Sequence, residues 1–271
     1  MKCNNGGNMN QEKKVVKEFI IKKYSDVASQ HSLGSSEDSE IIEIIPLNII
    51  SSSLNIGYSE SDLGNIPISS NMGLGCGNPI IAANLKEGEV VLDLGSGGGI
   101  DCFLARRKVG ESGYVIGVDM TSQMIQLAQQ NKEKSNYTNI DFRLGEIEHL
   151  PVEDNSIDVI ISNCVVNLSL NKLQVFKDAF RVLKSKGRIC ISDILATAEL
   201  PEEVKNNLAS LAGCVAGAEF VGNIRKMLIT AGFRDIQLTP KDNSRQILET
   251  WAPTSDLSDF VASYLIEAKK D

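Results

Sequence analysis

Cysteine is the residue type in this 271-residue chain whose placement is most informative about chemistry. There are six cysteines, and no two of them form a Cys-x-x-Cys pair, which argues against the common zinc sites. In a reducing compartment they are expected to be mostly thiols, with roles in packing, redox chemistry or binding of a soft element. The six are Cys3, Cys76, Cys102, Cys164, Cys190 and Cys214.

Three cysteines lie in segments where the backbone permits close approach. Cys164 directly follows a short apolar run at 159–162, Cys76 lies between glycines in the loop 71–79, and Cys214 lies among small residues where a helix is expected to end. Three thiolates from separate segments can form a trigonal site for a soft, pyramidal ion such as As(III), leaving its lone pair free. By spacing alone, however, simple burial remains the default interpretation of Cys76 and Cys214.

The other cysteines and the histidines suggest no further chemistry. Cys102 is expected in the first turns of a helix and Cys190 inside an apolar strand, and both positions are typical of core residues. Cys3 lies in a polar tail. The only histidines, His31 and His149, do not support a histidine-based acid/base mechanism.

A glycine-rich segment follows the first predicted strand. The sequence Asp-x-Gly-x-Gly-x-Gly occupies residues 93–99, where glycine lets the backbone approach a ligand closely. A dinucleotide fingerprint would place its third glycine at position 100, which is Ile100 here. The spacing instead matches the first motif of class I methyltransferases and predicts contacts with the amino-acid part of S-adenosylmethionine from Asp93, Gly95, Ser96 and Gly97.

The ends of the next strands extend this predicted cofactor site. Asp119 ends the second strand, where a carboxylate can accept two hydrogen bonds from ribose hydroxyls; the alternative for Asp119 is a helix N-cap. Met120 is expected to pack on the adenine. The segment after the third strand is expected to bind the adenine amino group through Gly145, Glu146 and Ile147. A different nucleotide remains the alternative ligand.

At the end of the fourth strand, many nucleic-acid amine methyltransferases carry Asn-Pro-Pro-Tyr. Here the residues are Ser162, Asn163, Cys164 and Val165, so we expect a thiolate to face the sulfonium and Asn163 to contact the cofactor. Open parallel sheets place their chemistry at this edge, where strand order reverses.

The elements that must position these residues alternate regularly from residue 89 onward. Short apolar runs and longer amphipathic segments predict an α/β fold with a doubly wound, mostly parallel, Rossmann-like sheet. Strands are expected at 90–94, 114–118, 140–144, 159–162, 188–192, 236–239 and 260–267, the last two as an antiparallel edge pair. Helices are expected at 102–108, 121–134, 173–184, 201–212 and 221–231.

The N-terminal part is expected to be less regular. Residues 1–10 are expected to be a tail and 11–29 a helix with Val15, Phe19, Ile20 and Tyr24 on one face, followed by a polar loop. The organisation predicted is an N-terminal tail, helix and cysteine loop at 1–83, a cofactor-binding core at 84–198, and a helical substrate-binding portion with the final strands at 199–271.

Composition limits the classes of partner. The chain is 42% hydrophobic and 23% charged, enough for one large core, and its formal charge is −8. Such a charge gives no attraction to nucleic acid or anionic lipid, and no apolar run approaches the ~20 residues of a membrane-spanning helix. The N-terminus lacks the apolar region of a secretory signal, so the expected location is the cytoplasm.

Taken together, these segments resemble the microbial arsenite methyltransferase family. The similar segments are 71–79, 93–101, 117–121, 145–151, 161–168 and 212–218. The resemblance implies that Cys76, Cys164 and Cys214 bind As(III), supplied as arsenite or its thiol conjugates, and that its lone pair attacks the methyl group of S-adenosylmethionine. The oxidised arsenic would then be reduced by cysteine thiols, and the resulting disulfide reset by thioredoxin or glutathione.

Many family members carry a fourth cysteine in the N-terminal region, but residues 11–75 contain none. Cys3 is the only substitute, so the route of the disulfide relay stays open. Two alternatives are also open: a methyltransferase acting on a small organic acceptor, with Cys164 merely lining the pocket, and a non-enzymatic protein that sequesters arsenic.

Overall fold

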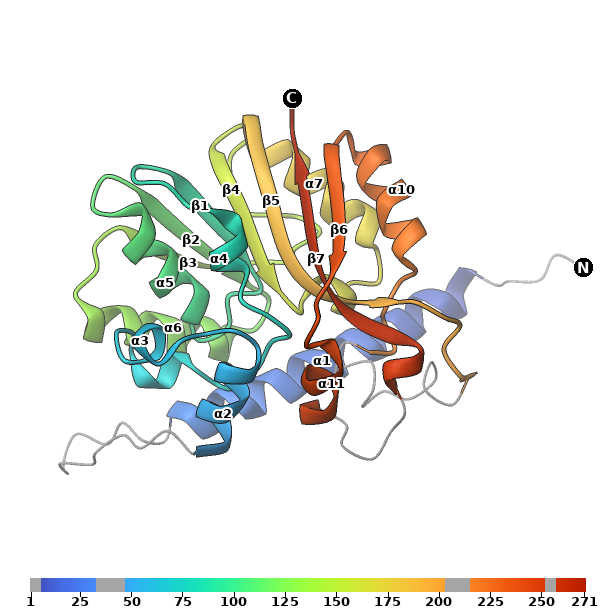
Figure 1. Cartoon of the computed structure of the whole chain (residues 1–271), viewed down its shortest axis with the longest axis horizontal. Helices are drawn as coiled ribbons and strands as arrows, with labels where there is room; N and C mark the ends of the chain where they lie inside the picture. Colours follow the sequence, from blue (N-terminus) through green and yellow to red (C-terminus); the bar gives the residue numbers. More distant parts are fainter. Residues whose placement is uncertain (1–5, 33–46, 203–214, 252–256) are drawn as a thin grey trace, which may run out of the picture.

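A single seven-stranded sheet organises the molecule (Figure 1). The computed structural model describes residues 6–32, 47–202, 215–251 and 257–271. Across these residues the strand order is β3-β2-β1-β4-β5-β7-β6. The predicted class of fold is therefore confirmed, with strand order reversing between β1 and β4.

The first five strands run parallel. The first three match the predicted positions closely, whereas the fourth and fifth are longer than predicted, and the fifth begins at Leu183, inside the predicted helix 173–184. The five strands are β1 (Val90–Leu94), β2 (Tyr114–Asp119), β3 (Ile140–Leu144), β4 (Ile157–Asn163) and β5 (Leu183–Ala196). In the register of β1 and β4, Leu94 lies opposite Ser162. The glycine segment after β1 and Cys164 after β4 therefore begin side by side.

Helices cover both faces of this sheet. Alternate residues of each strand face opposite sides, so Val91 belongs to one apolar cluster and Leu92 to the other. Helices α5 (Ile100–Val109) and α6 (Ser122–Ser135) follow β1 and β2, whereas α7 (Lys172–Val182) and α10 (Val221–Ala231) contact each other beside the β4–β6 half.

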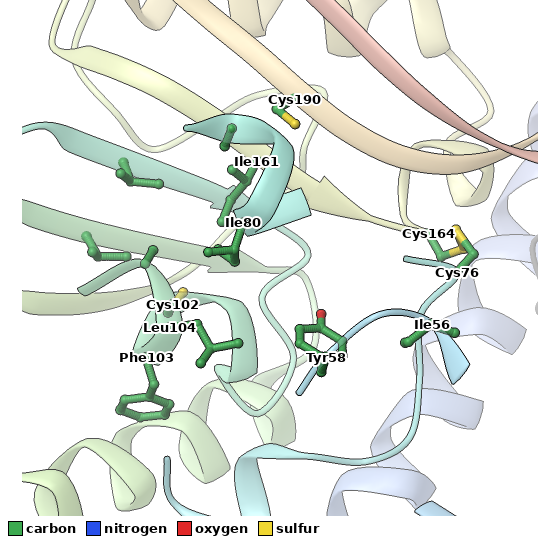
Figure 2. Packing of buried hydrophobic residues seen from close by; sticks show 14 of the residues in the cluster. Ile56, Tyr58, Cys76, Ile80, Cys102, Phe103, Leu104, Ile161, Cys164 and Cys190 are labelled. Carbon is green, nitrogen blue, oxygen red and sulfur yellow. A yellow bond between two sulfur atoms is a disulfide. The ribbon is translucent and has the colours of Figure 1, made fainter. Parts of the chain in front are cut away.

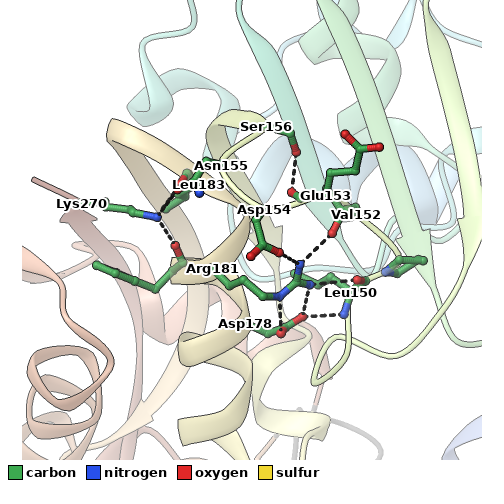
Figure 3. A network of polar contacts seen from close by, with 12 residues as sticks. Leu150, Val152, Glu153, Asp154, Asn155, Ser156, Asp178, Arg181, Leu183 and Lys270 are labelled. Atoms are coloured by element: carbon green, nitrogen blue, oxygen red, sulfur yellow. Dashed lines mark hydrogen bonds and ion pairs between the residues drawn. The ribbon is translucent and has the colours of Figure 1, made fainter.

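An ion-pair network ties α7 to the loop before β4 (Figure 3). The Arg181 guanidinium contacts Asp178 at 2.9 Å and Asp154 at 2.7 Å. It also donates hydrogen bonds to the carbonyl oxygens of Leu150 and Val152. The preorganised donors of arginine suit this arrangement, in which one side chain closes a loop of backbone.

Helix α1 (Gly6–Ser32) crosses the lower end of the sheet and contacts α6 (Figure 1). It begins earlier than expected, because Gly6 to Asn10 are helical. Its predicted apolar face is also wrong in part, since Val15 is 54% exposed and Phe19 36%, whereas Ile20 is 1% exposed. The buried stripe continues from Ile20 toward Ala28, which clusters with Met124 and Leu127 of α6.

Short helices that the sequence pattern did not predict fill residues 47–83. They are α2 (Leu47–Asn55), α3 (Glu60–Leu63), the 3₁₀ turn η1 (Ile68–Ser70) and α4 (Pro79–Ala83). Local caps explain two of them: Ser59 and Asp62 form a capping box on α3, and the Asn78 side chain caps α4 ahead of Pro79. The Cys76 loop lies between η1 and α4.

The C-terminal strands form an antiparallel pair, as predicted, but only β6 is an edge strand. These strands are β6 (Arg234–Pro240) and β7 (Val261–Lys269), separated by α11 (Ser244–Trp251) and the turn η3 (Leu257–Asp259). Strand β7 pairs with β5 on one side and β6 on the other. The reason is burial, since β7 carries alternate buried residues and β6 has none.

Two further expectations concern the predicted helix 201–212 and membrane-spanning segments. Most of the predicted helix 201–212 is not among the described residues. Within the part of the chain that the structure describes, no helix has the combination of length and apolar character needed to cross a bilayer.

Candidate active site

A cavity of about 700 Å³ lies at the carboxyl ends of β1, β2 and β4. One wall comes from α1, through Ile20, Tyr24 and Val27 among others. The opposite wall includes the glycine segment, the end of β2 and the residues after β4. The predicted cofactor residues that line it are Asp93, Gly95, Ser96, Gly97, Asp119, Met120, Ile147 and Asn163.

The glycine segment turns tightly at the end of β1. The amides of Gly95 and Ser96 both donate hydrogen bonds to the Val118 carbonyl, at 2.8 and 3.0 Å. Gly95 and Gly97 have φ values of 72° and 50°, in the left-handed region that favours glycine. The buried Ser96 hydroxyl has no hydrogen-bond partner among the described residues, so a ligand in the cavity would give it one.

Asp119 joins the first two strand ends. One of its carboxylate oxygens accepts a hydrogen bond from the Gly97 amide at 3.0 Å, and the other accepts one from the Thr121 amide at 2.9 Å. Burial raises the pKa of Asp119, and these two amides oppose that shift. Each oxygen retains a lone pair for a further donor, which suits a ligand that carries two adjacent hydroxyls.

Two more buried carboxylates line the cavity, those of Asp93 in β1 and Asp101 in the first turn of α5. Burial, and then the nearby Asp101, raise the pKa of Asp93 well above its usual value. Burial also raises the pKa of Asp101 to about 6, against hydrogen bonds from Tyr58 and Asn163. A cationic ligand beside these carboxyls would favour their ionised forms, so the electrostatics of this end suit a positively charged molecule.

Cys76 and Cys164 are joined by a disulfide, although they are 88 residues apart in sequence (Figure 2). The expectation that the cysteines are mostly thiols is therefore wrong for this pair. The reason is the fold, which brings the Cys76 loop against the end of β4. Cys164 has a φ of 58°, and its side chain lines the cavity, whereas Cys76 is fully enclosed.

The backbone and sulfur of Cys76 are held by side chains from distant segments. Its amide donates to the Asn163 side-chain oxygen at 2.9 Å, and its carbonyl accepts from Lys241 Nζ at 3.2 Å and Ser263 Oγ at 2.8 Å. Its Sγ lies 3.7 Å from Ser192 Oγ. We call Asn163, Ser192, Lys241 and Ser263 the Cys76 clamp.

The Asn163 side chain hydrogen-bonds to the cysteine loop, which the sequence did not suggest. Its side-chain nitrogen donates to the Gly77 carbonyl at 2.6 Å and to the Tyr58 hydroxyl at 3.0 Å. Tyr58 in turn donates to Asp101 at 2.8 Å. Asn163 thus links the cysteine loop to the buried carboxylates of the cavity.

Asp193 completes a group of soft and hard donors around the disulfide. The two sulfurs and a carboxylate oxygen of Asp193 all lie within 4.8 Å of one another, and all three residues are buried. Burial raises the pKa of Asp193 to about 7, although amides of residues 194, 167 and 166 oppose the shift. Its position after Ser192 in β5, the strand next to β4, could have indicated its proximity.

The other residues that the sequence singled out either do not line the cavity or lie outside the described residues. The Gly145 amide donates to the Asp119 carbonyl at 2.9 Å, and the Glu146 carboxylate forms an ion pair with Lys17 of α1 at 2.5 Å. Neither residue lines the cavity. Cys214 lies outside the described residues. Cys102 and Cys190 are buried away from the disulfide, and burial raises the pKa of both thiols, that of Cys190 to about 12 (Figure 2).

Sequence reasoning missed the residues that reach the site only through the tertiary fold. These are the cavity-facing side chains of α1, and Tyr58, Asp101, Ser192, Asp193, Lys241 and Ser263. Asp101 ends a segment already recognised by its resemblance, so it could have been included. For Lys241 and Ser263 no local pattern gives a signal.

Comparisons with known proteins agree with this geometry. The sequence model of the family described as "Methyltransferase domain" matches residues 85–248. An arsenite methyltransferase of Halobacterium salinarum is 49% identical over 220 residues, covering 81% of this chain and 56% of that protein. The arsenite methyltransferase of Homo sapiens is 36% identical over 168 residues, covering 59% of this chain and 44% of that protein. The chain thus spans about half the length of these curated relatives.

A solved structure gives the same result. The crystal structure of CrArsM, an arsenic (III) S-adenosylmethionine methyltransferase from Chlamydomonas reinhardtii, superposes with a TM-score of 0.59 at 31% identity, covering 83% of this chain and 74% of that one. Sequence and fold therefore agree that this chain belongs to the arsenite methyltransferase family, within the methyltransferases of the class I fold.

Proposed function

We propose that this protein transfers methyl groups from S-adenosylmethionine to trivalent arsenic held by cysteine thiolates. One observation carries the proposal: Cys164, bonded to Cys76, lines the same cavity as the glycine segment and Asp119. A soft-element site and a nucleoside site therefore share one cavity. The family relationship supports arsenic as the element.

The cofactor end of the cavity fits S-adenosylmethionine. Its ribose hydroxyls suit the two oxygens of Asp119, its adenine suits Met120 and Ile147, and its amino-acid part suits the glycine segment. The positive charge of the molecule suits the buried carboxyls of Asp93 and Asp101. When bound, the cofactor supplies an electrophilic methyl group on a sulfonium.

At the arsenic end, the protein's task is to hold the substrate in line with that methyl group. After reduction of the disulfide, Cys76 and Cys164 supply two thiolates, and the resemblance supplies Cys214 as the third. The arsenic lone pair carries no proton, so no general base is required. Positioning within a cavity that excludes water supplies the acceleration.

A redox step completes the cycle in this proposal. Methylation takes arsenic from the trivalent to the pentavalent state, and two thiolates return it by giving up two electrons and forming a disulfide. The Cys76–Cys164 bond is the product expected from that step. A thiol reductant of the cytoplasm, thioredoxin or glutathione, then restores the two thiols.

The test is arsenic speciation after incubation of the purified protein with arsenite, S-adenosylmethionine and a dithiol. Methylated arsenic that depends on the cofactor is the expected result. Cys164→Ser should abolish it, whereas the matched control Cys102→Ser should retain it, since Cys102 is buried away from the disulfide. Intact cofactor binding without any methylated arsenic would instead favour a small organic acceptor, for which Ile20, Tyr24 and Val27 of α1 provide a surface.

A further inference from the structure

The two sulfurs of the Cys76–Cys164 disulfide differ in their access to the cavity. Cys164 lines the cavity and is 6% exposed, whereas Cys76 is 0% exposed and does not line it. Thiol–disulfide exchange requires the incoming thiolate to approach one particular sulfur. A thiol that enters the cavity therefore meets Cys164 before Cys76.

The two sulfurs also differ in the charge that faces them. Lys241 Nζ donates a hydrogen bond to Ser192 Oγ at 2.7 Å, and Ser192 Oγ lies 3.7 Å from Cys76 Sγ. An ammonium can only donate hydrogen bonds, so the Ser192 oxygen accepts from Lys241. The hydroxyl hydrogen of Ser192 is then free to point elsewhere. A sulfur in a disulfide carries no hydrogen, so in this contact the serine must be the donor.

This arrangement stabilises negative charge on Cys76 in particular. The Lys241 side-chain nitrogen also donates a hydrogen bond to the Cys76 carbonyl oxygen at 3.2 Å. The Asp193 carboxylate lies within 4.8 Å of both sulfurs and so does not select one of them by proximity. The Lys241 ammonium and the Ser192 hydroxyl, by contrast, contact the carbonyl oxygen and the sulfur of Cys76, whereas Ser192 meets Cys164 through its backbone carbonyl, which accepts from the Cys164 amide.

We propose that Ser192 and Lys241 give the reduction of this disulfide a direction, with Cys164 as the sulfur attacked and Cys76 as the leaving thiolate. The sulfur of a thiolate reductant bonds to Cys164 Sγ while the Cys76–Cys164 bond breaks. The bonding electron pair goes to Cys76 Sγ, where the Ser192 hydroxyl and, through it, the Lys241 ammonium stabilise it. A second reductant thiolate then displaces Cys164 and leaves as a disulfide with the first. Ser192 contacts the reacting atom, and Lys241 is a positioning residue.

This inference deepens the reduction step of the proposed function, but its test requires neither arsenic nor S-adenosylmethionine. The full chain is first oxidised with diamide, then mixed with limiting glutathione, quenched with acid and alkylated. Peptide mass spectrometry identifies which cysteine carries glutathione and which carries the alkyl group. In the wild type we expect glutathione on Cys164 and the alkyl group on Cys76.

The variants separate leaving-group stabilisation from a merely structural effect. Ser192→Ala and Lys241→Met should slow the first exchange roughly tenfold, since a poorer leaving thiolate departs more slowly. Lys241→Arg should restore most of the rate. Ser53→Ala is the matched control, because it removes a buried serine hydroxyl that bonds to the Ile49 carbonyl and the Asn71 side chain and belongs to no part of the site, and it should keep both rate and adduct position.

Glutathione on Cys76 in the wild type would overturn the inference. So would an unchanged exchange rate in both Ser192→Ala and Lys241→Met, or a loss in Ser53→Ala as large as theirs. If exchange is directional but no arsenic is ever methylated, the inference stands and the proposed function fails. The two hypotheses are therefore tested separately.

Discussion

Among single residues, Asp193 gives the clearest dependence of stability on pH. Its pKa is raised by burial to about 7 in the folded protein, from an ordinary value near 3.8. A raised carboxyl pKa means that the folded state holds the proton more tightly, so this group costs stability progressively as pH rises from about 4 to about 7. We expect Asp193→Asn to gain stability relative to the wild type across this window, with no further change above it. Urea unfolding at a series of pH values measures the difference.

Asp178 should show the opposite trend. Burial favours its neutral form, but hydrogen bonds from Arg181 and the Leu150 amide outweigh burial and lower its pKa (Figure 3). Its contribution is therefore present at neutral pH and lost as pH falls through the lowered pKa. Asp178→Asn should destabilise the protein most at neutral pH, and the gap from the wild type should narrow in acid. An Asp178→Asn gap that does not vary with pH would contradict the role of the carboxylate.

The glycine before Cys76 is a third residue with a sharp prediction. Gly75 has a φ of 119°, and a Cβ there would lie 2.7 Å from the Asn163 side-chain nitrogen. Gly75→Ala should therefore cost about 1–3 kcal/mol of stability, and displace the cysteine loop. The matched control is Gly222→Ala in α10, where a Cβ meets nothing within 4 Å and alanine favours the helix. Equal thermal midpoints in the two variants would show that the loop tolerates the strain.

How much of the site could be predicted from sequence depends on how locally each contact is determined. Asp119 and the glycine segment are placed by a strand and the turn that follows it, so their neighbourhood was predictable. The pairing of Cys76 with Cys164 depends on a loop whose path no periodicity describes. Ser263 and Lys241 reach the Cys76 carbonyl across separations of 187 and 165 residues, and such contacts are set by strand pairing, not by local pattern.

Among the elements, α1 is the part that closes the cavity. Ile20 is buried in its contact with the rest of the molecule, whereas Val15, five residues earlier, is exposed. Ile20→Ala should weaken docking of α1 by about 2–5 kcal/mol, whereas Val15→Ala should change little. We expect faster hydrogen exchange in α1 and weaker S-adenosylmethionine binding in Ile20→Ala alone, with the sheet unaffected. Equally faster exchange in the sheet strands would mean that Ile20→Ala destabilises the whole fold, and unchanged exchange in α1 would show that Ile20 does not anchor it.

The length and pattern of each element explain which elements could be predicted from the sequence. The parallel strands were found because each is a short apolar run bounded by turns. Helices α3 and α4 have four and five residues, too few for a helical period to be visible, so only their caps identify them. The edge position of β7 was predicted wrongly because pairing order depends on the burial of both its faces, which alternation in a single strand does not reveal.

For the molecule as a whole, the disulfide links the segment before β1 to the end of β4. It closes a span of 88 residues, and a crosslink of that length is worth about 4–5 kcal/mol in the chain-entropy description. The oxidised protein should therefore unfold at higher urea concentration than the reduced one, with the difference abolished in Cys76→Ser. A higher midpoint for the reduced protein would mean that the bond strains the native fold.

The position of β7 between β5 and β6 also has a consequence during synthesis. A ribosome makes Cys76 and Cys164 long before it makes Lys241 and Ser263, and these last two hold the Cys76 carbonyl. The sheet cannot close until its last strand inserts between two strands already made. A nascent chain therefore carries both cysteines but lacks half of the Cys76 clamp, and it acquires a finished site only after Ser263 has been made.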